Sequence, residues 1–380
     1  MKLAAIVAVF LVAVLAVAAL FSWRQKAKFA ATKDTHDLRQ QVEKMATAYA
    51  KQRSNVALTI GVLQKGKTHF LGFGSIRPGT NLPPDDKTLY EIGSVTKIFT
   101  TTLLARLVAE NRVKLDDPVS KYLPKNLPLA PKLQAVTLAH LATHTAGMPR
   151  LPHNFRITFE NAKDPYCNYT TTNLYEELAT IDLDGVPGAR SRYSNLGVGL
   201  LGHLLGLAAG QPYKTLVTEQ ICVPLALHDT VFAPDADQSR RLVRGYDHTG
   251  NLTPPWTFDV MAPAGALHST ASDLLLFLQA NLKPPEGPLG EGLKSAQTVY
   301  VQNWNGQVAL GWQVLAGLEG LQYHWHNGGT GGFVSFCGFD LQSQTAVVLL
   351  SNYGDAMSGR IPTDSMGLEI LRLAAKISWE

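Results

Sequence analysis

The sequence predicts an α+β fold, in which an antiparallel sheet is flanked by two terminal helices and joined to a mostly helical second lobe. Strand patterns bounded by turn residues stand near both ends of the chain, at residues 55–63, 67–74, 321–326, 332–340 and 345–351. Helical periodicity precedes the first strands, at 35–53, and follows the last, at 363–379. We therefore expect the two ends of the chain to join in one sheet.

These patterns divide residues 35–380 into two lobes of one domain. We assign about 35–115 and 300–380 to a sheet lobe, and about 115–300, which is rich in helical periodicity, proline and loops, to a helical lobe. An active site is expected between the lobes, where clefts commonly lie. The net charge of +4 comes without a Lys/Arg cluster, so no nucleic-acid partner is expected.

The first 30 residues predict a membrane address. An apolar run from Leu3 to Phe21 would span about 28 Å as a helix, close to the thickness of a bilayer core. We favour an uncleaved anchor because the run is long for a signal peptide, although Ala16-Val17-Ala18 is an acceptable cleavage site. In both cases the rest of the chain is expected outside the cytoplasm, in the periplasm or at the outer face of the inner membrane.

The first motif with a chemical meaning is Ser94-Val95-Thr96-Lys97. Apolar residues at helical spacing follow it, so a helix is predicted to begin near Ser94. Residues three apart share one face of a helix, which places the Lys97 amine beside the Ser94 hydroxyl. A serine hydroxyl is a weak nucleophile that needs an adjacent base. Lys97 can be that base if burial or a neighbouring cation lowers its pKa from the usual value of about 10.4.

Two further motifs follow in order: Tyr193-Ser194-Asn195 in a loop before a helix, and His326-Asn327-Gly328-Gly329 at the end of a strand. Each of the three motifs is weak alone because patterns this short arise by chance. Their joint occurrence in these settings predicts a serine nucleophile whose proton is handled by lysine and tyrosine. A phenol and an amine in contact titrate as one unit, so the sequence does not assign the base to Lys97 or Tyr193 alone.

In their order and setting these motifs resemble the class C β-lactamase-like family of penicillin-recognising serine hydrolases. That family includes class C β-lactamases, D-Ala-D-Ala carboxypeptidases and endopeptidases, D-amino-acid peptidases and esterases. Segments 113–124, 138–149 and 262–273 extend the resemblance over nearly the whole chain. Segments 75–79 and 224–232 are similar to the periplasmic D-Ala-D-Ala carboxypeptidase/endopeptidase branch.

The resemblance implies a β-lactamase/transpeptidase-like fold and an acyl-enzyme mechanism in which Ser94, Lys97 and Tyr193 are catalytic. It also implies an oxyanion hole formed by the backbone N–H groups of Ser94 and Gly329. Glycine suits that position because it allows close backbone approach without a Cβ atom.

The resemblance further implies substrate-binding roles for Asn195, His326 and Asn327, with the Asn195 amide in contact with Lys97. Many relatives have Lys-Thr-Gly where this chain has His326-Asn327-Gly328, and the His-x-Gly form is commoner among peptidases and esterases than among lactamases. If His326 contacts the carboxylate of the substrate, its charge is expected to fall across physiological pH. The preference for a carboxylate-terminated substrate would then weaken between about pH 5.5 and 8.

The function predicted from these features is hydrolysis of a peptide ending in D-alanine, or of a related amide, through an acyl-enzyme. An esterase or weak β-lactamase of the same fold is one alternative. A penicillin-binding sensor or scaffold that is acylated without turnover is another, and the sequence does not separate them. Expected partners are the small peptide, β-lactam or ester substrate and, through the N-terminal segment, the membrane.

No metal or other cofactor is expected. His140 and His144 are four residues apart, but no third ligand is evident, and Thr145-Ala146-Gly147 reads as the end of a helix. A structural role is favoured for both histidines.

The remaining distinctive residues leave alternatives open. A Cys167–Cys222 disulfide is compatible with an oxidising compartment, whereas Cys337 lies in an apolar strand pattern and is expected to be buried. The tyrosines at 166, 169 and 175 belong either to the rim of the cleft or to a packed or disordered loop.

Overall fold

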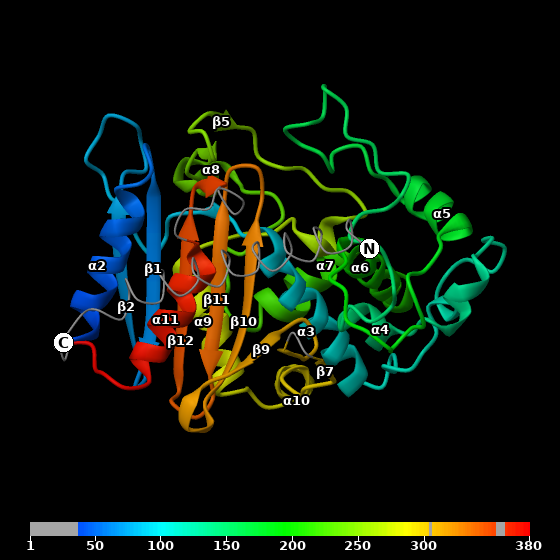
Figure 1. Cartoon of the computed structure of the whole chain (residues 1–380). Helices are drawn as coiled ribbons and strands as arrows, with labels where there is room; N and C mark the ends of the chain where they lie inside the picture. The colour runs from blue at the N-terminus through cyan, green and yellow to red at the C-terminus, as the bar shows by residue number, and fades with distance from the viewer. Residues whose placement is uncertain (1–36, 304–305, 355–361) are drawn as a thin grey trace, which may run out of the picture.

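A computed structural model describes residues 37–303, 306–354 and 362–380 (Figure 1). Its main feature is an eight-stranded antiparallel sheet with the order β2-β1-β12-β11-β10-β9-β8-β7. The strands are β1 Ala57–Gln64, β2 Lys67–Gly74, β7 Val301–Asn303, β8 Gly306–Val308, β9 Gln313–Ala316, β10 Gln322–Gly329, β11 Val334–Asp340 and β12 Thr345–Ser351. Short strands β3 Tyr90–Glu91 and β6 His268–Ser269 pair with each other, and β4 Gly245–Asp247 lies between β5 Leu252–Thr253 and β13 Tyr353–Gly354.

The prediction that the two ends of the chain share one sheet is confirmed. β1 pairs with β12 over six residues, so that Leu58 faces Ser351 and Leu63 faces Ala346. All five predicted strands are present, with ends shifted by at most three residues. The sequence did not predict β7, β8 and β9, which add an edge to the sheet. These strands are only three or four residues long, too short for an alternating pattern to stand out.

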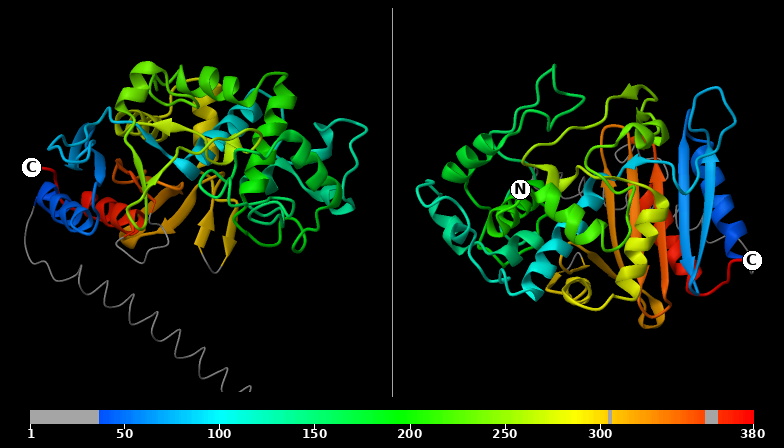
Figure 2. Two further views of the ribbon diagram at one scale, coloured as in Figure 1. Left: turned by 90° about the horizontal axis from the view of Figure 1, so that it is seen from above. Right: turned by 180° about the vertical axis from the view of Figure 1, so that it is seen from behind.

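Helices cover both faces of the sheet (Figure 2). They are α2 Leu38–Ala50, α3 Thr96–Ala109, α4 Leu138–Ala142, α5 Thr171–Thr180, α6 Asn195–Ala209, α7 Tyr213–Val217, α8 Ala236–Arg241, α9 Ala271–Leu282, α10 Pro288–Ala296 and α11 Thr363–Ala374. The terminal helices α2 and α11 lie on one face, and α9 packs on β1, β11 and β12 from the other.

Strand alternation explains this layering. Successive side chains of a strand point to opposite faces. Val347 and Leu349 of β12 join the hydrophobic core beneath α2 and α11, whereas Ala346, Val348 and Leu350 join the larger core shared with α3 and α9. Both faces are apolar and every residue of β12 is buried.

The closing helix ends earlier than its sequence pattern predicts. α11 stops at Ala374 instead of continuing to residue 379. Beyond it, the Trp379 ring stacks on His69 with 4.6 Å between centroids, and the Trp379 N–H donates to Gln64 Oε1 at 2.9 Å. The Leu38 N–H donates to the carbonyl of Ser378 at 2.9 Å. These tertiary contacts outweigh the local helical pattern and bind the C-terminus to β1, β2 and the start of α2.

α9 lies within the stretch that the sequence assigns to the helical lobe, yet it packs on the sheet. One hydrophobic core also runs through α3, α6, α9 and the sheet. The boundary of the lobes near residue 300 therefore remains an interpretation.

The three cysteines are all free, so the Cys167–Cys222 bridge does not form. Cys337 is fully buried in β11, as its strand pattern predicts. The membrane anchor or signal peptide predicted for residues 1–30 lies outside the described residues. Within the described ranges, no helix combines the length and the apolar character needed to cross a bilayer.

The seating of α11 on the sheet gives a test of the fold. A Cβ atom at Gly367 would lie 2.3 Å from the ring of Phe336 on β11, so Gly367→Ala should lower the free energy of unfolding by about 1–3 kcal/mol. Helix propensity alone would favour alanine by about 1 kcal/mol. Ser365→Ala on the exposed side of α11 is the control and should change stability by less than about 0.5 kcal/mol. Chemical denaturation measures both, and an unchanged or raised stability of Gly367→Ala would contradict this packing.

Candidate active site

Ser94 and Lys97 lie where a short 3-10 helix, Gly93–Val95, runs into α3. The Lys97 Nζ donates to Ser94 Oγ at 2.9 Å and to the backbone carbonyl of Ala264 at 2.5 Å. Ser94 is partly exposed, whereas Lys97 has no exposed surface. The predicted pairing of hydroxyl and amine on one helical face is therefore present, with the amine buried beneath the hydroxyl.

Tyr193 reaches the same point from the loop before α6. Ser194 caps that helix, because its Oγ accepts the N–H of Gly197 at 2.9 Å while donating to the carbonyl of Pro149 at 2.6 Å. The cap fixes the residue before it, and the Ser94 side chain lies close enough to the Tyr193 hydroxyl to favour the charged form of the phenol and so lower its pKa. The Lys97 Nζ lies 5.0 Å from the centroid of the Tyr193 ring. All three predicted catalytic side chains thus meet.

Burial moves the pKa values of the two candidate bases in opposite directions. It lowers the pKa of Lys97 well below its ordinary value, and the positive charge of Arg150 lowers it further. Burial raises the pKa of Tyr193, although the Ser94 side chain and Arg150 oppose that shift. Burial therefore favours the neutral form of both groups, the unprotonated amine and the protonated phenol. A neutral amine can accept the Ser94 proton across the 2.9 Å contact.

Two glycines bring the end of β10 against the serine. A Cβ atom on Gly93, whose φ is +48°, would lie 2.7 Å from the backbone nitrogen of Gly329. A Cβ atom on Gly328 would lie 2.0 Å from the carbonyl oxygen of Ile92 and 2.9 Å from the backbone nitrogen of Ser94. The close approach that was expected to require glycine at 329 therefore requires glycine at 93 and 328 instead. A Cβ atom on Gly329 would meet only the Phe333 oxygen, at 3.8 Å.

His326 does not have the titrating charge that the sequence suggested. It is 1% exposed, and burial, with the nearby Lys97, lowers its pKa to about 3. Its Nδ1 lies 2.6 Å from the Asn327 carbonyl, an acceptor, so Nδ1 holds the proton of the neutral ring. The expected loss of imidazolium charge between pH 5.5 and 8 is therefore wrong, because His326 is already neutral below that range.

The hydrogen bonds of Asn195 differ from the predicted contact with Lys97. The Asn195 Nδ2 donates to the Tyr166 hydroxyl at 2.8 Å instead of approaching Lys97, and its buried Oδ1 has no hydrogen-bond partner among the described residues. Asn327 is exposed and follows His326 on β10, so its side chain leaves the opposite face of the strand.

Several residues at the site carry no motif. His144, whose φ is +59°, places its ring 4.6 Å from that of Tyr193, and its Nδ1 accepts the Ser194 N–H at 3.2 Å. Burial lowers the pKa of His144 to about 3, with smaller contributions from nearby positive groups. This contact explains His144 without a metal, while His140 caps α4 by accepting the Thr137 N–H at 3.2 Å.

Buried Glu91 connects two segments beside the serine. Its carboxylate accepts the Trp256 N–H at 2.7 Å and the Thr330 hydroxyl at 2.5 Å, and burial raises its pKa to about 7. Tyr166 stacks on Phe258, with ring centroids 4.9 Å apart. The segment containing Tyr166 is therefore packed at the site. The sequence does not reveal that these residues lie at the site, because their contact partners are distant in sequence.

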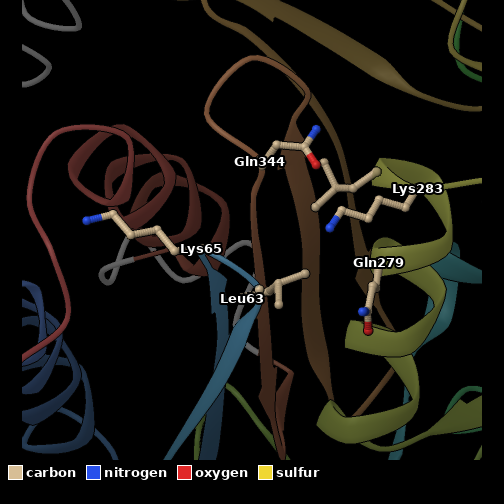
Figure 3. A pocket seen from close by; sticks show the side chains of 7 residues that line it. Leu63, Lys65, Gln279, Lys283 and Gln344 are labelled. Atoms are coloured by element: carbon tan, nitrogen blue, oxygen red, sulfur yellow. The ribbon is translucent and has the colours of Figure 1, made fainter.

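A pocket of about 220 Å³ lies elsewhere (Figure 3). Leu63, Gln279, Lys283 and Gln344 line it, whereas the Lys65 amine points away and donates to Ser378 Oγ at 2.8 Å. Strand register places Leu63 opposite Ala346, at the end of the sheet away from Gly329, which pairs with Val334. This pocket is therefore separate from the serine site.

A buried lysine paired with a helix-borne serine, next to the end of a sheet strand, defines a serine hydrolase of the penicillin-recognising class. The sequence profile of the Beta-lactamase family matches residues 42–366, so the chain belongs to the Beta-lactamase family. It is accordingly a serine hydrolase of the acyl-enzyme type.

Curated relatives and solved structures agree with this assignment. A β-lactamase of Pseudomonas fluorescens is 30% identical over 282 residues, covering 73% of this chain and 75% of the relative. The D-alanyl-D-alanine-carboxypeptidase/endopeptidase AmpH of Escherichia coli K12 is 29% identical over 298 residues, covering 73% and 74%. The β-lactamase/D-alanine carboxypeptidase structure from Yersinia pestis has a TM-score of 0.74 at 25% identity, covering 88% and 97%. The corresponding structure from Pseudomonas syringae, with a TM-score of 0.76 at 22% identity and coverage of 88% and 98%, shows the same fold.

The contact between Gly328 and the serine turn can be tested with a matched pair of variants. Gly328→Ala should push β10 away from Ser94 and lower kcat/KM about 100-fold or more, as loss of an oxyanion donor does. Gly329→Ala adds the same methyl group one residue later, into open space, and should cost much less. Steady-state kinetics on a short-chain ester, with melting curves to verify folding, distinguish the two. Equal losses would contradict the assigned contact.

Proposed function

We propose that the chain hydrolyses peptides ending in D-Ala-D-Ala, or closely related amides, with Ser94 as the nucleophile. The observation that carries the proposal is the 2.9 Å contact between Ser94 Oγ and the fully buried Lys97 amine. The relative AmpH is a D-alanyl-D-alanine-carboxypeptidase/endopeptidase, which supports the substrate class. The histidine at 326, where many relatives have lysine, favours a peptidase or esterase over a lactamase as the primary activity.

In the proposed acylation step Ser94 Oγ attacks the carbonyl carbon, and its proton passes to the neutral Lys97 amine. The oxyanion receives the backbone N–H groups of Ser94 and Gly329, which are brought together by the glycine contacts described above. The Tyr193 hydroxyl, which lies beside Ser94, carries a proton from Lys97 to the leaving amine. Water then hydrolyses the ester formed on Ser94, with Lys97 and Tyr193 again handling the proton.

We place substrate contacts at Asn195, His326 and Asn327. The unpartnered Oδ1 of Asn195 supports its role, because a buried acceptor without a donor is available to an amide N–H of the substrate. Neutral His326 offers Nε2 as an acceptor rather than a positive charge. Asn327, exposed at the end of β10, supplies an amide from the other face of the strand.

We further propose that residues 35–380 form one hydrolase domain, with the site between a sheet lobe and a helical lobe. The domain acts outside the cytoplasm, because the apolar run from Leu3 to Phe21 addresses the chain to a membrane as an anchor or a signal peptide.

The nucleophile and the substrate are tested together. A fluorescent penicillin should label the wild type, and the protein should turn over a D-Ala-D-Ala peptide faster than a short-chain ester. Ser94→Ala should lose labelling and all hydrolysis while melting normally, because only a partly exposed hydroxyl is removed. Ser239→Ala on the exposed side of α8 is the control. A permanent adduct without turnover of either substrate would indicate a sensor, ester turnover alone would indicate an esterase, and turnover by Ser94→Ala would refute the covalent mechanism.

The pairing of Lys97 and Tyr193 predicts kinetics that are not additive. Lys97→Ala and Tyr193→Phe should each lower the rate by about 10²–10⁴-fold, and the double variant should lose little more than the worse single variant. The base form of Lys97 accumulates as pH rises through its lowered pKa, so wild-type kcat/KM should rise with pH and level off well below pH 10. Full additivity, or a rise only near pH 10, would contradict this assignment.

A further inference from the structure

Recognition of a terminal carboxylate requires a positive charge or several donors at the site. The sequence pattern predicts that residue 326 binds the carboxylate. His326 is buried, however, and its Nδ1 donates to the Asn327 carbonyl at 2.6 Å. Lys97 is fully buried and hydrogen-bonded to Ser94 and Ala264. Neither residue presents a free cation to a substrate.

Arg150 does present one. It is exposed, and its guanidinium carbon lies 5.0 Å from the centroid of the Tyr193 ring, which also lies 5.0 Å from Lys97 Nζ. Among the described residues, no carboxylate forms an ion pair with Arg150, and no acceptor is hydrogen-bonded to its side chain. Arg192, in contrast, forms an ion pair with Asp184.

The backbone of Arg150 is fixed to the site. Its carbonyl accepts the N–H of Asn195 at 2.9 Å and of Leu196 at 3.4 Å, so the residue is bound to the first turn of α6. The preceding residue, Pro149, accepts the hydroxyl of the helix cap Ser194 at 2.6 Å. The Arg150 side chain therefore starts from a defined point beside Tyr193 and Asn195. Its charge is felt by Lys97, His144, Tyr166 and Tyr193.

From these contacts we infer that Arg150 binds the carboxylate of the substrate, and that the preferred substrates are acyl compounds with an anionic group near the scissile carbonyl. The inference rests on the proposed hydrolase function and names the residue that selects among its substrates. A guanidinium offers a planar fork of donors that matches a carboxylate, which a neutral imidazole does not. Stacking on Tyr193 orients that fork while leaving its edge free.

The test compares a peptide ending in D-Ala-D-Ala with the same peptide bearing a C-terminal carboxamide, using the full chain. The wild type should prefer the acid, and Arg150→Gln should lower the acid-to-amide ratio of kcat/KM about tenfold or more, mainly through KM. Arg150→Lys should restore part of the ratio, because lysine keeps the charge and loses the fork. Arg77→Gln, which removes the same charge from the exposed loop after β2, should leave the ratio unchanged.

The pH dependence supplies a second readout. Burial keeps His326 neutral in this range, so the wild-type acid-to-amide ratio of kcat/KM should be flat from about pH 5.5 to 8. Removal of the Arg150 charge should also raise the pKa of Lys97. The rising part of the pH profile of kcat/KM should then move to higher pH for both peptides alike. If the pH profile moves while the acid-to-amide ratio of kcat/KM stays unchanged, the inference that Arg150 binds the substrate is overturned. Arg150 would then act only through its charge on Lys97.

Two other outcomes would also overturn the inference. One is a wild type that hydrolyses the carboxamide as well as the acid, and the other is a ratio that falls as pH rises, which would return the role to a titrating group. Failure of the proposed function has a different signature, because the wild type would then release product from neither peptide and Ser94 would not be labelled. Melting curves of the Arg150 variants verify that they are folded.

Discussion

The burial of one amine is the constraint on which the rest of this site depends. A charged lysine is costly to bury, and desolvation therefore favours its neutral form. Lys97 is enclosed by the core around α3 and by the loop carrying Ala264, whose carbonyl accepts one of its N–H groups. The same enclosure orients the amine toward Ser94 across 2.9 Å. Packing of the helix thus sets both the geometry and the protonation state of the proposed base.

The second requirement is that three segments remote in sequence meet at one hydroxyl group. Ser94 lies in the 3-10 helix that leads into α3, Tyr193 in the loop before α6, and the amide of the proposed oxyanion hole at the end of β10. The pairing of β10 with β9 ends at Trp325. The last residues of β10 therefore have no β9 partner on that side and lie against the serine turn. The absence of side chains at Gly93 and Gly328 makes that contact sterically feasible. The sheet therefore acts as a rigid support that holds one wall of the site against the helix carrying the other.

The sequence could predict what depends on short-range patterns. Strand patterns bounded by turn residues located β1, β2 and the three strands β10 to β12, and helical spacing located the Ser94–Lys97 pair. It could not predict the three short strands β7 to β9, or the end of α11 at Ala374, where contacts with β1 and β2 override a helical pattern. The contact of Asn195 with Tyr166 was hidden for the same reason, since the two residues are 29 positions apart and no periodicity links them. His144 looked like a residue that only ends a helix, yet its left-handed backbone directs the ring to Tyr193.

The prediction for His326 failed for an instructive physical reason. An isolated imidazole titrates near neutral pH, but burial inside the packed β10–β11 pair disfavours the charged form of the His326 ring, and the nearby Lys97 adds to that effect. A lysine at this position would be a second amine next to Lys97 and would repel its proton. In this chain exposed Arg150 makes such an electrostatic contribution, because its charge lowers the pKa of Lys97. A neutral histidine at 326 and a free arginine at 150 are therefore parts of one arrangement: the positive charge lies where solvent and substrate can reach it, and the buried amine stays free to accept a proton.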